Sequence, residues 1–278
     1  MRTTRNIFAV AAVALTALAC PAAKAAESDV PPKQRWSFAG PFGLYDEAQL
    51  QRGFKVYQEV CKRCHSINLL AFRNLADPGG PGFSTAQATA IAAQFQVTDG
   101  PNDQGEMFQR AGRLADYIPP PYPNEQAARA TLNAVPPDFS TIAKARGVER
   151  GFPWFIFDMF TQYQEGGVDY IAAYLNGYED NPPPGVTLPA TASYNKYFPG
   201  HATSMPRPMV DGQVDYTDGT PATVEQYSKD MAAFLMWVAE PHLEARKRLG
   251  FQVMIFLIVL AGLLYFTKKK VWAEVQAQ

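Results

Sequence analysis

The sequence is poor in cysteine, and this scarcity limits what can hold its fold together. Three cysteines occur among the 278 residues, at Cys20, Cys61 and Cys64. Cys20 lies in an N-terminal stretch that we expect to be removed, and the other two are too close together to staple a fold. A disulfide framework is therefore excluded. Strand patterns are few and repeats are absent, whereas the 23 prolines predict a mostly helical body with long loops.

Acidic residues are scarce at both ends of the chain. Residues 1–25 and 240–278 each carry a net charge of +3, so residues 26–239 hold 16 basic and 23 acidic side chains, a net −7. Such an acidic body argues against a nucleic-acid partner. It favours either a basic protein partner attracted by charge or a surface that is simply well solvated.

The N-terminal hydrophobic run is too short to span a bilayer. Residues 7–19 are apolar, follow Arg2 and Arg5, and precede the small-residue site Ala23-Lys24-Ala25. This order is typical of a secretory signal peptide, which we place at residues 1–25. A lipoprotein signal ending at Cys20 is disfavoured by the residues before it.

A second hydrophobic run, residues 249–266, contains no charge and is bracketed by basic triplets at 246–248 and 268–270. Eighteen helical residues span roughly 27 Å, enough for the hydrocarbon core of a membrane. The flanking charges and Trp272 disfavour a buried core helix. We predict a transmembrane helix over 244–267, a cytoplasmic tail over 268–278, and a periplasmic domain over 26–243 of a bacterial inner-membrane protein.

The body between these ends shows several helical patterns. The predicted helices cover 46–66, 124–133, 152–164 (aromatic, apolar and expected to be buried), 168–176, and a helix capped by Thr220 with Pro221 at its first position. In the first of these, Cys61 and Cys64 continue one apolar helical face. We interpret the whole body as one domain.

The motif Cys61-Lys62-Arg63-Cys64-His65 is the attachment pattern of haem c. Two thiols one turn apart can each add to a vinyl group of one porphyrin, and the adjacent histidine can bind the iron. A zinc site would need His201 and His242 as further ligands at poor spacing. A thioredoxin-like redox pair would require a preceding strand, whereas a helical face precedes this motif.

The sixth iron ligand stays open on residue chemistry alone. A thioether or a second imidazole would give a closed iron suited to electron transfer. Met205 and Met209 lie in an irregular Pro-rich loop and are the main candidates, followed by His201. The other methionines of the body are Met107, Met159, Met231 and Met236, of which the last three lie on expected helices and favour core packing.

Several longer stretches resemble the cytochrome c1 family, the haem c subunit of the cytochrome bc1 complex. The similarity runs from about residue 42 to 272. The stretches that carry it are QRGF (51–54) through CKRCHS (61–66), PPDFS (136–140) with AR (145–146), YFPG (197–200) to MP (205–206), DGTPAT (218–223), FLMW (234–237) to EP (240–241), and RKR (246–248).

This resemblance implies a class I cytochrome c-like haem domain with His65 and Met205 as axial ligands of one covalent haem c. It also implies that Arg146 and Tyr170 lie near the haem propionates and that Pro137 packs on the ring. The chain departs from some bacterial relatives in having no second cysteine pair to stiffen the distal side. Something else, such as the prolines of the loop, must then hold Met205.

The resemblance further implies the function. The haem would take an electron from the Rieske iron–sulfur subunit, beside cytochrome b in a dimeric complex, and pass it to a soluble c-type cytochrome. The chain would be no enzyme on its own. Acidic residues that could attract a basic acceptor are Glu179, Asp180, Asp211, Asp215 and Asp218. The alternatives are a free-standing tethered electron carrier and the haem subunit of a periplasmic dehydrogenase.

Overall fold

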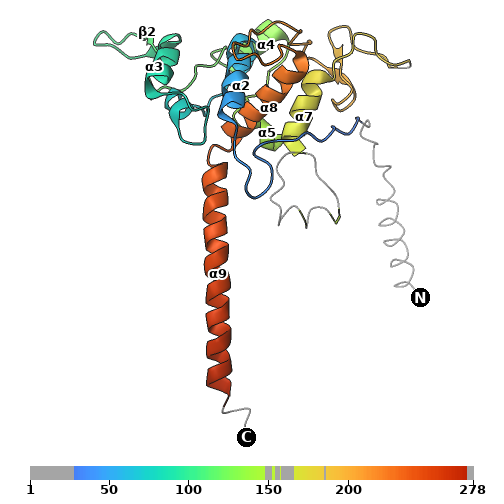
Figure 1. Ribbon diagram of the computed structural model, residues 1–278. Helices are drawn as coiled ribbons and strands as arrows, with labels where there is room; N and C mark the ends of the chain where they lie inside the picture. The colour runs from blue at the N-terminus through green and yellow to red at the C-terminus, as the bar shows by residue number, and fades with distance from the viewer. Residues whose placement is uncertain (1–27, 148–151, 154–156, 158–165, 185, 274–278) are drawn as a thin grey trace, which may run out of the picture.

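The structure is a computed structural model that describes residues 28–147, 152, 153, 157, 166–184 and 186–273. Figure 1 shows a helical body from which one long helix, α9, extends alone. The helices of the described residues are α2 (Glu47–Glu59), η1 (Cys61–Arg63), η2 (Phe72–Ala76), α3 (Thr85–Ala93), α4 (Glu125–Leu132), α5 (Ile142–Ala145), α7 (Gly166–Asn176), α8 (Val224–Ala239) and α9 (Leu243–Trp272). The predicted mostly helical fold is confirmed, and the expected signal peptide lies outside the described residues.

Two small antiparallel sheets complete the described body. β1 (Gln96–Asp99) pairs with β2 (Phe108–Ala111) in a hairpin that lies to one side of the helices (Figure 1). β3 (Ser193–Tyr194) pairs with β4 (Ala202–Thr203) in the loop region that precedes Met205. These strands are short enough that the sequence pattern gave little sign of them.

The core is built around α8, which packs against α2 on one side and α7 on the other (Figure 1). Phe234 and Trp237 of α8 are fully buried, as is Phe54 of α2. α2 approaches α8 closely because residue 53 is a glycine: a Cβ added there would lie 2.2 Å from the Asp230 carbonyl oxygen. Apolar burial of this kind is the main source of stability in a domain without disulfides.

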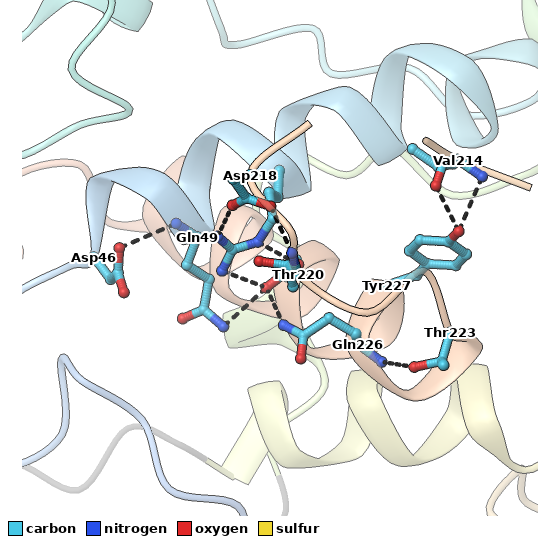
Figure 2. A network of polar contacts seen from close by, with 10 residues as sticks. Asp46, Gln49, Val214, Asp218, Thr220, Thr223, Gln226 and Tyr227 are labelled. Atoms are coloured by element: carbon cyan, nitrogen blue, oxygen red, sulfur yellow. Dashed lines mark hydrogen bonds and ion pairs between the residues drawn. The ribbon is translucent and has the colours of Figure 1, made fainter. Parts of the chain in front are cut away.

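A polar network ties α2 and α8 to the loop before α8 (Figure 2). Arg52 of α2 donates from Nε to Asp230 Oδ2 at 2.9 Å and from Nη1 to Asp218 Oδ2 at 2.8 Å. The side-chain amides of Gln49 and Gln226 also donate to Asp230. The Asp230 carboxylate is fully buried, and these bonds provide the partners that a buried charge requires.

Two predicted helices occur almost where the sequence placed them. α4 begins after Asn124, whose side chain accepts from the Ala127 amide, and it ends at Asn133, which adopts a left-handed conformation. α7 ends at Asn176, as predicted. Both ends of α4 are determined by local capping chemistry, which sequence patterns capture well.

Two helix ends differ from the prediction. α2 ends at Glu59 rather than continuing to residue 66, because the chain after the C-cap Val60 (φ −116°, ψ −63°) tightens into a 3-10 turn over the cysteine motif. α8 is capped by Thr223, whose hydroxyl accepts from the Gln226 amide at 3.3 Å, and not by Thr220 (Figure 2). The Thr220 amide instead donates to Asp218.

The aromatic segment 152–164 was expected to be a buried helix. Phe152 is 81% exposed and lies in a turn, and Phe157 is 55% exposed, so the expectation of burial is wrong for these two residues. Pro153 is exposed in the same turn, and the other residues of the segment lie outside the described residues.

The C-terminal helix α9 contains thirty residues, about 45 Å at 1.5 Å per residue. None of its most apolar 18-residue window is buried against the body. An apolar helix that is exposed on all sides is not a core helix of a soluble domain, and its length suffices to cross a bilayer. The chain therefore has one C-terminal membrane-crossing helix, which contains the predicted span 244–267.

Candidate haem-attachment site

The two cysteines of the motif lie on the short turn η1, directly after α2. The amides of Cys64 and His65 both donate to the Cys61 carbonyl oxygen, at 3.1 and 3.0 Å, and these bonds fix the turn. Cys61 is buried and its Sγ lies 3.9 Å from Met231 Sδ on α8, whereas Cys64 is only partly buried. Both are free thiols.

The pKa of the Cys61 thiol helps to decide between haem attachment and a redox role for this pair of cysteines. Burial, with a smaller contribution from neighbouring Cys64, raises the pKa of the Cys61 thiol to about 12. Reactive redox cysteines need a lowered thiol pKa. Among the residues that the structure describes, no three His, Cys, Asp or Glu side chains gather as a metal ion would require. Neither the thioredoxin-like nor the zinc alternative gains support.

The His65 imidazole is oriented by a hydrogen bond that it donates to a distant part of the chain. Its Nδ1 lies 2.9 Å from the carbonyl oxygen of Pro137, and since a carbonyl can only accept, Nδ1 carries the proton. Nε2 then bears the free lone pair that a metal ligand needs. Burial lowers the pKa of His65, which keeps the ring neutral, and the Phe139 ring stacks on it at 4.1 Å.

The segment that carries Pro137 is itself fastened to the haem motif. Asp138 accepts from the Ser66 hydroxyl at 2.7 Å and from the Asn68 amide at 2.9 Å, and the Phe139 amide donates to the Ser66 carbonyl. Burial alone would raise the pKa of Asp138, but hydrogen bonds from Ser140 and Ser66 lower it, so the carboxylate is ionised. No role was predicted for Asp138 from sequence, because its partners Ser66 and Asn68 lie 72 and 70 residues away. Only the Pro-Pro-Asp-Phe-Ser stretch pointed to it.

The candidates for the sixth ligand differ in burial. Met209 is 1% exposed, and Met231 and Met236 on α8 are equally buried within the core, which favours packing roles. Met205 is partly buried and lies at the edge of the core. His201 stacks on Tyr194 and its Nδ1 lies 3.4 Å from the Asn195 carbonyl oxygen. Met205 is thus the candidate of the Pro-rich loop that is not already enclosed by apolar side chains.

Hydrogen bonds hold the loop that carries Met205. The Thr203 hydroxyl lies 2.8 Å from the Tyr174 hydroxyl of α7 and accepts from the Met205 amide at 3.3 Å. Farther along, Arg207 donates to the Tyr178 carbonyl at 2.8 Å and pairs with Asp180. The pairing of β3 with β4 adds backbone bonds. These contacts, and not only the prolines, restrain the loop.

Of the residues expected near the haem, Arg146 and Tyr170 lie near each other, and Pro137 lies beside His65. Arg146 is exposed at the end of α5, and its charge acts on Tyr170 of α7. Burial raises the pKa of Tyr170, and the nearby Arg146 guanidinium opposes this shift. The structure therefore brings Arg146 and Tyr170 into electrostatic reach of each other. Pro137 is exposed and is placed beside His65 by its carbonyl bond.

The donor set fits a covalent haem c. Two cysteines on one turn suit thioether formation, and the adjacent neutral imidazole presents its free Nε2 for the iron. The site and the long apolar helix α9 together define the class of protein: this is a membrane-anchored c-type cytochrome.

Comparison with known proteins gives the family. Residues 36–275 match the Cytochrome C1 family. The chain is 53% identical over 275 residues to "Cytochrome c1" of Blastochloris viridis, covering 98% of this chain and 97% of that protein. The chain belongs to the cytochrome c1 family, whose members are electron-transfer subunits of the cytochrome bc1 complex.

Two further relatives, one bacterial and one mitochondrial, are similar over most of this chain. The chain is 64% identical over 248 residues to "Cytochrome b/c1" of Bradyrhizobium diazoefficiens, covering 89% of this chain but only 36% of that longer protein. It is 44% identical over 248 residues to "Cytochrome c1, heme protein, mitochondrial" of Saccharomyces cerevisiae, covering 89% of this chain and 74% of that protein. The predicted family is confirmed.

Proposed function

We propose that this chain holds one haem c through thioether bonds from Cys61 and Cys64, with His65 and Met205 as axial ligands of the iron. When bound, the haem supplies a reversible one-electron carrier. The observation that carries this proposal is the bond from His65 Nδ1 to the Pro137 carbonyl, because it leaves Nε2 free beside two unlinked thiols.

The surrounding residues have supporting roles in this proposal. Arg146 and Tyr170 bind the propionates, where a guanidinium and a phenol can both donate to carboxylates. Pro137 packs near the ring edge while its carbonyl orients His65. The hydrogen bonds of Thr203 keep Met205 from moving away from the iron.

The chain works as one subunit of a larger assembly, with its body in the periplasm of a bacterium and α9 in the inner membrane. We infer that it takes an electron from a Rieske iron–sulfur subunit, beside cytochrome b in a dimeric complex, and delivers it to a soluble c-type cytochrome. The 64% identity to a protein named "Cytochrome b/c1" supports a cytochrome b partner. Alone, the chain has no catalytic activity to perform.

The acidic residues expected to attract a basic acceptor are not equally available. Asp211 accepts from the Val224 amide and Asp218 pairs with Arg52, so both have structural roles. Asp180 is 82% exposed at its side chain, although it pairs with Arg207, and Glu179 lies 3.9 Å from Lys196. We therefore place the acceptor near Glu179 and Asp180 rather than near Asp218.

A visible spectrum of the C-terminally tagged protein, purified from membranes in mild detergent, tests the assignment. Reduced b-type and c-type bands together with a Rieske protein are expected. A c-type band alone would replace the complex by a free-standing tethered carrier. A c-type band with a dehydrogenase in the same fraction would indicate the second alternative, and absence of a haem band would refute haem binding.

The docking proposal has its own test. Association with a basic cytochrome c should slow as salt rises, and a Glu179→Gln/Asp180→Asn double variant should weaken this dependence. Asp103→Asn, in the loop between β1 and β2, removes another exposed acid as a control. A salt-independent rate would exclude electrostatic attraction of the acceptor.

A further inference from the structure

The first residues of α9 are fastened to the loop that precedes α2. The Lys247 ammonium is buried and donates to the Phe38 carbonyl at 2.6 Å and the Gly43 carbonyl at 3.2 Å. The Glu244 carboxylate accepts from the Tyr45 amide at 2.8 Å. Charged hydrogen bonds of this kind are stronger than neutral ones, so they hold this loop and the first residues of α9 together.

The part of the loop between these bonds is apolar and faces outward. Phe42 is 72% exposed and Leu44 is 56% exposed, although both flank Gly43, whose carbonyl is held by Lys247. In Figure 1 the segment leading into α2 descends below the helices of the body, beside the upper end of α9. Large apolar side chains that are exposed together in this way indicate a surface that contacts something other than water.

A contact between two aromatic rings shows which part of α9 the loop lies beside. The Phe42 ring lies 5.7 Å from the Phe251 ring, centroid to centroid, with the planes at 74°. Phe251 is the third residue after the basic triplet 246–248 and lies inside the uncharged stretch 249–266. At 1.5 Å per residue, it lies about 4.5 Å beyond Arg248 along the helix, where the headgroup region gives way to the hydrocarbon.

We propose that Phe42 and Leu44 insert into the boundary between lipid headgroups and acyl chains, as a second membrane contact beside α9. The exposed apolar surface of α9 is the membrane-facing surface of the chain, and Phe42 continues it through Phe251. Aromatic residues favour this boundary, and basic residues such as Arg246 and Arg248 suit the anionic headgroups beside it. A single helix could swivel, whereas two contacts restrain the tilt of the haem-bearing body.

Site-directed spin labelling of the intact complex in phospholipid nanodiscs tests this proposal. Phe42→Cys and Leu44→Cys are prepared and labelled as separate variants. Cys61 and Cys64 do not compete for the label, because both are bonded to the haem. Accessibility to oxygen, which concentrates in lipid, is compared with accessibility to a water-soluble nickel chelate. The reference positions are Met107→Cys, 61% exposed beside β2 and away from α9, and Phe256→Cys, 63% exposed within α9.

The outcomes separate lipid, water and protein as the surroundings of the loop. A ratio of oxygen to nickel accessibility well above that of Met107→Cys, approaching that of Phe256→Cys, is expected at both positions. A ratio equal to that of Met107→Cys would show a loop in water and overturn the proposal. Low accessibility to both reagents would show that another subunit covers the loop, and would overturn it equally. A normal c-type spectrum confirms that each variant is folded.

Discussion

Arg52 of α2 bridges two carboxylates that differ completely in exposure: its Nε donates to fully buried Asp230 at 2.9 Å, and its Nη1 donates to partly exposed Asp218 at 2.8 Å (Figure 2). Asp230 lies on α8, and Asp218 lies in the loop that precedes it. One guanidinium therefore joins the helix that leads into the haem motif to the helix that packs against Cys61.

Arg52→Met should destabilise the protein strongly, because the buried Asp230 carboxylate would lose its countercharge. Breaking a buried pair from one side costs about 3–5 kcal/mol, and the remaining amides of Gln49 and Gln226 place the expected loss of unfolding free energy near the lower end, about 3 kcal/mol. Unfolding of the detergent-purified protein with guanidinium chloride measures this loss. The control is Lys229→Ala, which removes an exposed pair with Glu225 and should cost about 0.3–0.5 kcal/mol. Equal losses would contradict the proposed role of the network.

Asp218 should contribute to the acid sensitivity of the protein. Hydrogen bonds from the Thr220 amide and hydroxyl, then from Arg52, lower the pKa of Asp218 to about 2 from an ordinary 3.8. A depressed carboxyl pKa gives stability that is fully present above about pH 4 and is lost as the pH falls toward 2. Asp218→Asn should therefore lower the melting temperature at pH 6 and flatten its decline between pH 4 and pH 2. Asp103→Asn should leave that decline unchanged, and an unaltered slope in Asp218→Asn would refute the linkage.

The sequence predicted features that depend on neighbouring residues and missed those that depend on distant ones. The ends of α4 were found because Asn124 and Asn133 cap it locally. The end of α2 was missed because the apolar period continues through Cys61 and Cys64, while the break at Val60 carries no composition signal.

The candidate site shows the same division. The Cys61–His65 motif is contiguous and was recognised at once. The partner of His65 is a carbonyl 72 residues away, and the partners of Arg52 are 166 and 178 residues away, so no local pattern could pair them. Asp230 of α8 is fully buried although it is an acid, and no local sequence pattern marks it as buried, so only the packed structure explains it.

Thr203→Val should loosen the loop that carries Met205. The substitution keeps the shape of the side chain but removes the hydroxyl that meets Tyr174 and the Met205 amide. The Tyr174 hydroxyl still accepts from Tyr178 at 3.0 Å, but two hydrogen bonds are lost, so the expected loss is about 2 kcal/mol at roughly 1 kcal/mol for each bond. We expect the methionine-ligated visible spectrum to be lost at a lower temperature than in the parent protein. Thr203→Ser retains the hydroxyl and should behave like the parent, and a Ser variant as labile as the Val variant would contradict the argument.

Met205→Leu and Met209→Leu form a matched pair that assigns the sixth ligand. Both replace a thioether by an aliphatic side chain of similar volume in the same Pro-rich loop, so the packing cost should be below about 1.5 kcal/mol in each case. Met209 is 1% exposed and packs in the core, whereas Met205 is only partly buried. Because methionine ligation raises the potential of a His-ligated haem, Met205→Leu should lower the reduction potential markedly and change the visible spectrum toward an open iron. Met209→Leu should leave both nearly unchanged. The reverse result would move the ligand to Met209, and an unchanged spectrum and potential in both variants would leave His201 as the candidate to replace next.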